Sequence, residues 1–421
     1  MNRPEVVLVG GGMIALDQIL PSLYQLQRQG AIGEISVSAL NVRTLKTLAE
    51  SDTMLDAFPG QTFKPYPNLA GDLDQPHPHL FREVIASMPP RNLVIVGVPD
   101  QLHYDVIMTA LGANQHVCTV KPLVLSSAEA GEIEKEAFGR GLMVGIEYHK
   151  RFDDRSQMAR RRYRAGQFGE FRLGTACLLE KWYYRHSNFQ NWCTWENSDA
   201  FTYIGCHYVD LVHFITGLLP VAVSVYGIRD RYPNGNEGFL WTDARIIWNN
   251  GACLNVQNAL GLPDDAPGTN TQGLAMYCAG ADRGAWLAHS DQYRGLQYCY
   301  TQRPAGPGAT IYAEPSPDYL QYIDLGGKGL VPVGYGYRSV EFIVKAAIQI
   351  ERETEGLPAG AALARRRELL KEIDSAGVMA TPANSRFNEL VIEAGRLSIL
   401  NGGREALIGY DPPSVRLRKD R

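Results

Sequence analysis

The chain has 421 residues, enough for two domains, and its 45% hydrophobic and 20% charged content is ordinary for a globular enzyme. A formal net charge of −4 argues against nucleic acid or an anionic membrane as the main partner, and no run approaches the roughly 18 apolar residues of a membrane span. The N-terminus has no signal-peptide layout, and the seven cysteines are odd in number without a Cys-x-x-Cys pair, so we expect reduced thiols and a cytoplasmic protein.

The first predicted element is a short buried strand, Val6–Val9, which runs directly into Gly10-Gly11-Gly12-Met13-Ile14-Ala15 and then into a helix-like segment. This is the G-x-G-x-x-A form of a dinucleotide-binding turn. Gly10 permits the tight turn, Gly12 lets the pyrophosphate approach the backbone, and Ala15 lets the helix pack close to the strand. The spacing predicts that Gly10, Gly12, Met13, Ile14 and Ala15 contact a dinucleotide; the alternative is an ordinary glycine-rich turn.

The second predicted strand, Ile35–Leu40, does not end in the Asp or Glu that normally binds the ribose 2′-hydroxyl of NAD. Asn41 and Arg43 follow instead. A missing carboxylate removes repulsion against a 2′-phosphate, and Arg43 could bind one, which tilts the cofactor from NAD towards NADP. In the alternative, Arg43 is a surface residue and Asn41 binds the ribose.

Further strands are predicted at Asn92–Val98, Gln115–Val120 and Leu142–Tyr148, with helices between them. This alternation predicts a doubly wound parallel sheet, whose ligands bind beyond the carboxyl ends of its strands. The candidate cofactor contacts at those ends are Val98, Pro99, His103 and Lys121.

Five strings in this order resemble the Gfo/Idh/MocA family, whose members act on sugars and polyols. They are Gly10–Gly12, Val98–His103, Val120-Lys121-Pro122 (Glu-Lys-Pro with valine for glutamate), Glu147–Asp153 and Gly205-Cys206-His207-Tyr208-Val209-Asp210 (Gly-x-His-x-x-Asp). The resemblance implies an α/β Rossmann domain over residues 1–150. It also implies an α+β substrate domain over 151–421, built on a large, open, mostly antiparallel sheet through which a homodimer or homotetramer forms.

The sequence of the second half agrees with that fold. Strand-like runs separated by turn residues lie between Phe171 and Tyr300, and Asn249-Asn250-Gly251 between two of them is a hairpin signal. Late helices at Ser339–Glu351 and Arg386–Leu400 are expected to pack back on the sheet or on the first domain. The basic run Arg416–Lys419 is expected to be a frayed end.

The resemblance also implies catalytic roles. Lys121 would orient the substrate hydroxyl, and His207 would take its proton in oxidation and return it in reduction. The family's aspartate four residues before the histidine is Tyr203 here, which can form a hydrogen bond but carries no charge at neutral pH. Asp210 could hold His207 or cap neighbouring structure. In the alternatives, Lys121 is a surface lysine in a turn, His207 is hydrogen-bonded to the backbone at the start of a helix, and Tyr203 packs in the core.

Other expected substrate contacts are Tyr148, Arg151 and Trp182. Trp182 opens an aromatic stretch whose rings suit a sugar, although sheet core or an interface explains such rings equally well. His77-Pro78-His79 lies in a Pro-rich loop, and no metal is expected.

The sequence therefore predicts an NAD(P)-dependent oxidoreductase that acts on a secondary alcohol of a sugar, a sugar derivative or a cyclic polyol. One alternative is a glycoside hydrolase or lyase that oxidises its sugar transiently with bound NAD. The other is a non-catalytic, nucleotide-sensing binding protein, which the missing aspartate would permit.

Overall fold

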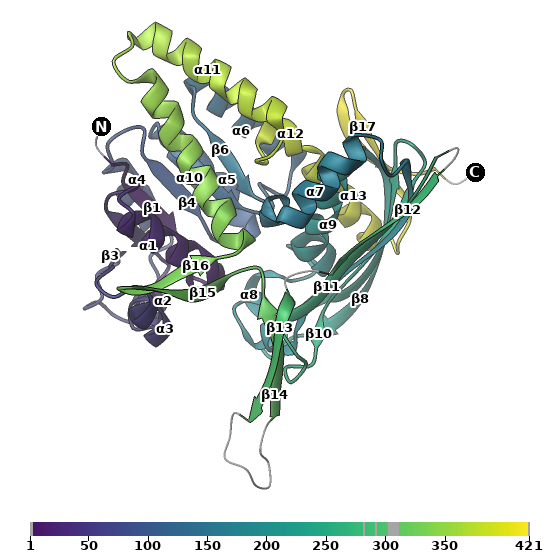
Figure 1. Ribbon diagram of the computed structural model, residues 1–421, viewed down its shortest axis with the longest axis horizontal. Coiled ribbons are helices and arrows are strands. Elements are labelled where there is room, and N and C mark those ends of the chain that lie inside the picture. The colour runs from purple at the N-terminus through teal and green to yellow at the C-terminus, as the bar shows by residue number, and fades with distance from the viewer. Residues whose placement is uncertain (1–2, 281–282, 291–292, 302–310, 420–421) are drawn as a thin grey trace. The chain divides into compact units, whose positions relative to one another are not determined.

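The computed structural model describes residues 3–280, 283–290, 293–301 and 311–419 (Figure 1). The chain divides into two units, and each is assembled from two separate stretches. The first unit comprises Met1–Phe152 and Leu320–Arg386, and the second comprises Asp153–Tyr319 and Phe387–Arg421.

The first unit contains a six-stranded parallel sheet in the order β3-β2-β1-β4-β5-β6. Its strands are β1 (Val6–Val9), β2 (Ile35–Ser38), β3 (Lys64–Tyr66), β4 (Leu93–Val96), β5 (His116–Val120) and β6 (Val144–Glu147). The central strands are runs of buried valine, isoleucine and leucine, as expected of a parallel sheet covered on both faces. This is the predicted doubly wound Rossmann sheet, and β3 is a strand that the sequence pattern did not reveal.

Helices connect and cover these strands. They are α1 (Leu20–Arg28), α2 (Val42–Ala49), α3 (Asp52–Ala57), α4 (Leu80–Ala86), α5 (His103–Gly112), α6 (Ser127–Arg140), α10 (Tyr335–Thr354), α11 (Ala359–Ala376) and α12 (Pro382–Ser385), with short turns η1 (Ala15–Ile19), η2 (Asp100–Leu102) and η3 (His149–Phe152). The π-helical turn η1 leads into α1, and Pro21, which has no N–H to donate to the carbonyl of Asp17, stands in the first turn of α1.

The returning stretch Leu320–Arg386 carries a small hairpin, β15 (Gln321–Gly327) and β16 (Gly329–Val333), and the helical pair α10 and α11 (Figure 1). A buried histidine ties this pair to the sheet. His116 Nδ1 accepts from Met143 N at 3.0 Å, and its Nε2 lies 3.0 Å from the Glu351 carboxylate on α10. Arg366 of α11 binds Glu351 with two hydrogen bonds. Burial lowers the pKa of His116 below its ordinary value, so the ring is neutral and Nε2–H donates to Glu351.

The second unit contains an eight-stranded sheet in the order β12-β11-β7-β10-β9-β8-β17-β18. Its strands are β7 (Glu170–Lys181), β8 (Pro220–Arg231), β9 (Glu237–Trp248), β10 (Cys253–Leu262), β11 (Asn270–Gly280), β12 (Arg283–Ser290), β17 (Ala406–Tyr410) and β18 (Pro413–Leu417). Every neighbouring pair is antiparallel except β7 and β10, which confirms the mostly antiparallel sheet. A separate hairpin joins β13 (Tyr293–Thr301) and β14 (Ile311–Pro317).

The prediction of a frayed C-terminal end was wrong. β17 pairs with β8, with Ala406 opposite Val223, and β18 pairs with β17 to form the sheet edge. Ala406 and Ile408 alternate with less buried neighbours, so β17 buries an apolar face while Arg416 of β18 stays at the edge.

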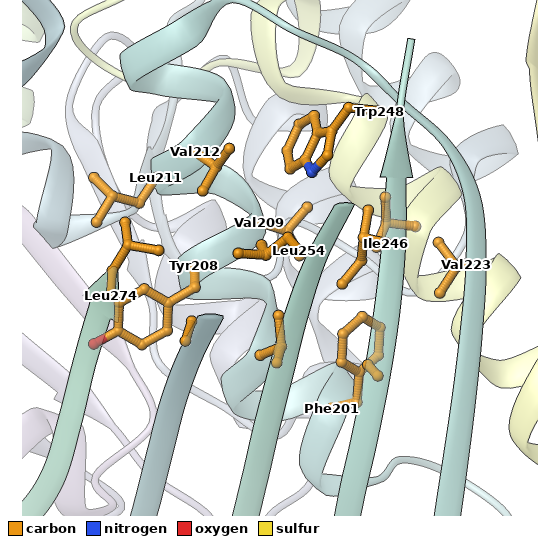
Figure 2. Packing of buried hydrophobic residues seen from close by; sticks show 14 of the residues in the cluster. Phe201, Tyr208, Val209, Leu211, Val212, Val223, Ile246, Trp248, Leu254 and Leu274 are labelled. Carbon is orange, nitrogen blue, oxygen red and sulfur yellow. The ribbon is translucent and has the colours of Figure 1, made fainter. Parts of the chain in front are cut away.

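The helices of the second unit are α7 (Asp154–Arg164), α8 (Phe189–Trp192), α9 (Cys206–Thr216) and α13 (Phe387–Leu400), with short turns η4 (Trp182–His186) and η5 (Phe201–Gly205). Figure 2 shows the core between α9 and the sheet, where Tyr208, Val209 and Val212 of α9 face Ile246 and Leu254 of the strands. Within the described parts of the chain, no helix combines the length and apolar character needed to cross a bilayer.

Candidate functional site

The turn after β1 has the geometry that a dinucleotide requires. Gly10 has φ of +112°, and a Cβ there would lie 2.2 Å from the carbonyl oxygen of Gly97, so only glycine fits. A Cβ on Gly12 would meet nothing within 4 Å, so the backbone of Gly12 is open to an approaching group. The turn is therefore closed by protein at Gly10 and open at Gly12, as the two proposed glycine roles demand.

The helix that follows begins directly after Gly12, whose carbonyl oxygen accepts from Ala15 N at 3.0 Å. Met13 and Ile14 are half-buried, whereas Ala15 is fully buried where the helix packs on the sheet. The N–H groups of a first helical turn can bind an anion such as a pyrophosphate. The residues present thus fit a dinucleotide at this turn.

The end of β2 differs from the expectation in one respect. The Asn41 side chain accepts from Thr44 N at 3.1 Å and so caps α2. Arg43 is paired with Asp74, its Nε and Nη2 lying 2.8 and 2.7 Å from the two carboxylate oxygens. Hydrogen bonding to Arg43 holds the pKa of Asp74 below its ordinary value. Arg43, the residue expected to bind a 2′-phosphate, is therefore already paired with a carboxylate. Sequence reasoning missed this partner, Asp74.

His103 joins the turn after β4 to the turn after β5. Its ring is fully buried, with Nε2 at 2.9 Å from the Val98 carbonyl oxygen and Nδ1 at 2.7 Å from the carbonyl oxygen of Pro122. Pro99 caps the short helical turn η2, which leads from Val98 to His103. Lys121 is largely buried and directly precedes Pro122. We therefore treat His103 as a positioning residue that fixes Lys121 relative to Val98.

The segment after β6 is also buried. Tyr148 and Arg151 are each 1% exposed, with the Arg151 guanidinium carbon 5.8 Å from the Tyr148 ring centre. Glu147, next to Tyr148, accepts from Gln18 Nε2 at 2.7 Å and lies 3.2 Å from His149 Nδ1. These contacts hold both candidate substrate residues on a rigid stretch.

The second unit holds the other catalytic candidates. Tyr203 lies in η5, and His207, 5% exposed, lies one turn later in α9. Asp199 fixes the start of this helix, because it accepts from Thr202 N at 2.8 Å and lies 3.0 Å from Arg396 Nη1. Asp199 is 1% exposed. Sequence reasoning missed this pair, although Asp199 two residues before Phe201 has the pattern of a helix cap.

Asp210 and Tyr203 each contact neighbouring elements of the second unit. Asp210 accepts from Asn388 Nδ2 of α13 at 3.0 Å, so it is engaged by a neighbouring helix. The Tyr203 ring is half-buried and meets Phe189 and Trp192 edge to face, at centroid distances of 4.7 and 5.6 Å. Tyr203 therefore belongs to an aromatic cluster whatever its hydroxyl does.

The candidate residues thus fall into two sets. The first unit brings together the glycine turn, Asn41, Arg43, Val98, Pro99, His103, Lys121, Tyr148 and Arg151, and the second unit carries Trp182, Tyr203 and His207. The proposed catalytic lysine and histidine therefore come from different units. In the described residues, no group of three or more His, Cys, Asp or Glu side chains could hold a metal ion, and His77 and His79 lie in a loop before α4.

Comparison with known proteins finds a family that resembles part of the chain. Residues 5–148 match the Gfo/Idh/MocA sequence model, described as an oxidoreductase family with an NAD-binding Rossmann fold. D-glucoside 3-dehydrogenase of Escherichia coli is 27% identical over 139 residues, which are 32% of this chain and 38% of that protein. The matched segments span between 20% and 38% of the length of the curated relatives.

Solved structures share the fold over nearly the whole chain. GenD2 from gentamicin A biosynthesis, in complex with NAD, has a TM-score of 0.64 at 15% identity and covers 97% of each chain. An inositol dehydrogenase homologue from Azotobacter vinelandii, complexed with NADH and myo-inositol, has a TM-score of 0.61 at 16% identity, covering 96% of this chain and 98% of that one. At such identities the likeness shows the fold alone.

Proposed function

We propose that this chain, whose residues 5–148 match the Gfo/Idh/MocA oxidoreductase family with an NAD-binding Rossmann fold, oxidises a secondary alcohol of a sugar, sugar derivative or cyclic polyol, or reduces the corresponding ketone. The observation that carries this proposal is the pairing of an open glycine turn at Gly12 with a largely buried lysine, Lys121, at the end of β5 in the same unit. The first can seat a dinucleotide, and the second can bind a hydroxyl oxygen.

Bound NAD(P) would accept or return the hydride. Gly10, Gly12, Met13, Ile14 and Ala15 would seat its pyrophosphate. Asn41, Arg43, Val98 and Pro99 would line the rest of the cofactor, while His103 would hold the turns in place.

The chain's own residues would handle the proton. The Lys121 ammonium would donate a hydrogen bond to the substrate hydroxyl and hold it in one orientation. His207 would accept the hydroxyl proton during oxidation and return it during reduction. Tyr203, one helical turn before His207, would offer a hydroxyl to the same oxygen, and Tyr148 and Arg151 would complete the substrate contacts.

The proposal is tested by following the absorbance of reduced nicotinamide over a panel of sugars and inositols, with NAD and with NADP. We expect stoichiometric cofactor reduction with at least one compound and a loss of about 10²- to 10⁴-fold in kcat for Lys121→Met and for His207→Asn. Cleavage of a glycoside without net reduction would instead show a transient redox enzyme. Absence of any turnover, with cofactor bound, would show a binding protein. Either result overturns the proposal.

We also propose that the chain self-associates through the open sheet of the second unit. Leu173, Tyr277 and Trp286 are directly opposite one another on β7, β11 and β12, and they are 50%, 49% and 68% exposed. A contiguous row of exposed apolar side chains on a sheet face is typical of an interface, and a second copy offers the same row.

A further inference from the structure

The second unit carries an exposed aromatic surface that the proposed hydride transfer does not use. Trp182 and Tyr183 follow β7 directly in η4 and are 42% and 44% exposed. We infer that these two residues, hereafter the aromatic shelf, bind a second, neutral sugar ring, so that the substrate is a glycoside rather than a single ring. This inference rests on the proposed function and specifies its substrate class.

The shelf is rigid because a buried arginine supports it from below. The guanidinium carbon of Arg185 lies 3.9 Å from the centre of the Trp182 ring and 5.3 Å from that of Trp241. Arg185 is itself 3% exposed and held by Asp230 at 2.5 Å and by the Leu260 carbonyl oxygen at 2.6 Å. One face of Trp182 is therefore occupied by Arg185, and its exposure must come from the rest of the ring.

The backbone beneath the shelf is also fixed. Lys181 Nζ donates to the carbonyl oxygens of Pro263 and Asp264 at 3.2 and 3.1 Å, and Tyr183 N donates to the Asp264 carboxylate at 2.9 Å. A ring held in this way loses little conformational entropy on binding, which favours affinity. Exposed aromatic rings on a flexible loop would not have this advantage.

A chain of ring contacts connects the shelf to the proposed catalytic tyrosine. Tyr183 meets Tyr184 at 4.8 Å between centroids, Tyr184 meets Phe189 at 5.1 Å, and Phe189 meets Tyr203 at 4.7 Å. All four side chains belong to one unit. Two rings lie between Tyr203 and Tyr183 in this series, so the shelf and Tyr203 belong to one connected aromatic cluster, along which a substrate of more than one ring can extend.

The chemistry of the shelf favours a neutral sugar. The C–H face of a pyranose packs on an aromatic ring, while its hydroxyls need polar neighbours at the edge. Asp264, which binds Tyr183 N, and the next residue, Asp265, are both exposed, and the Asp264 carboxylate can accept a hydroxyl hydrogen bond. Their negative charges would repel a sugar acid or a phosphorylated sugar.

The test compares matched pairs of probes: methyl β-D-glucopyranoside against cellobiose, and methyl β-D-galactopyranoside against lactose. Binding is measured by calorimetry on the full chain with NAD present, and turnover is measured in parallel. We expect the disaccharide to bind about 3- to 10-fold more tightly than the methyl glycoside in at least one series, the range that one aromatic contact supplies.

Variants assign that preference to the shelf. Trp182→Ala should lower disaccharide affinity about 3- to 10-fold more than methyl glycoside affinity, and Trp182→Phe should restore most of the difference. The matched control is Tyr226→Ala, which removes another exposed aromatic side chain, on β8, separated from β7 in the sheet by β10 and β9. This control should keep the full preference.

Two results overturn the inference: no disaccharide preference in either series, or a Trp182→Ala effect of equal size on both members of a pair. Failure of the proposed function gives a different pattern. In that case the disaccharide binds and Trp182→Ala weakens it selectively, but no sugar in the panel reduces either cofactor.

Discussion

The guanidinium of Arg43 is bound to the carboxylate of Asp74 by two hydrogen bonds, at the place where a dinucleotide fold discriminates NAD from NADP. Both side chains are exposed, so the pair contributes little to stability and its effect falls on ligand binding. A 2′-phosphate would have to displace Asp74 to reach Arg43. We expect Asp74→Ala to raise the ratio of kcat/KM for NADP to that for NAD about tenfold or more, because a charge-assisted hydrogen bond becomes available.

Arg43→Ala is the complementary variant and should lower the same ratio. The exposed pair Arg82–Asp105 serves as the control, since Asp105→Ala removes a similar ion pair elsewhere in the unit. If Asp74→Ala and Arg43→Ala leave the ratio as it is in the wild type, the 2′-position does not meet this pair.

Tyr203→Phe separates the two roles considered for this residue. The substitution keeps the ring that packs against Phe189 and Trp192 but removes the hydroxyl. We expect kcat to fall about 10²-fold, as for the loss of one donor at a reacting oxygen, while the thermal midpoint stays close to that of the wild type. A fully active Tyr203→Phe enzyme would show that Tyr203 serves packing alone.

The buried pair Asp199–Arg396 should hold the helix that carries Tyr203 and His207. Asp199→Ala removes the acceptor for Thr202 N and the carboxylate partner of Arg396, so it should lower the free energy of unfolding by about 1–3 kcal/mol. Asp199→Asn keeps an acceptor for Thr202 N and should lower the free energy of unfolding by less than Asp199→Ala does. Urea unfolding measures both effects. Glu237→Gln, in the exposed pair with Arg231, is the control; an equal loss there would argue against a special role for Asp199.

His116 should make the first unit sensitive to acid. Its pKa is depressed by burial, so the unfolded chain binds a proton below about pH 6.5 while the folded chain does not. Stability from this group is therefore present above that pH and is lost as pH falls, by up to about 1.4 kcal/mol per pH unit. Glu351 adds a further loss of stability at lower pH. Burial alone would raise the pKa of its carboxyl, but the hydrogen bonds and charges of His116 and Arg366 outweigh burial and lower that pKa.

The measurement is urea unfolding at intervals from pH 8 to pH 5. His116→Gln should be less stable than the wild type at pH 8, because buried hydrogen bonds to Met143 N and Glu351 are weakened, yet it should lose less stability on acidification. Parallel pH curves for the two proteins would count against the assignment.

Self-association through the open sheet should depend on Tyr277. Tyr277→Arg places a charge in the middle of the apolar row, and its copy in a two-fold related chain would meet the same row. We expect light scattering after size exclusion to show a smaller assembly. Tyr226→Arg is the matched control on β8, and retention of the wild-type mass by Tyr277→Arg would exclude this face.

The sequence predicted the parallel sheet well because its signals are local. A run of valines, a glycine turn and a helix lie within about twenty residues of one another, and they define β1 and the turn at Gly10 without any distant partner. The same locality explains the success with the hairpin of β9 and β10, whose turn residues lie between the strands they connect.

Distant partners escaped prediction. Asp74 meets Arg43 through a loop, and Arg396 meets Asp199, which lies 197 positions away along the chain. The edge strands β17 and β18 were missed because segments of only five residues become strands only when a sheet offers them an edge. The return of Leu320–Arg386 to the first unit likewise has no local signal.

That return limits how the protein can be divided. The segment matched to the family, residues 5–148, is not a complete unit, because α10 and α11 supply the partners of His116 from residues beyond 319. A fragment cut at Phe152 would expose that histidine and the apolar faces that these helices cover. Recombination that exchanged the cofactor-binding unit between relatives would need junctions near Phe152, Tyr319 and Arg386 together, so the two units are expected to be inherited as a single piece.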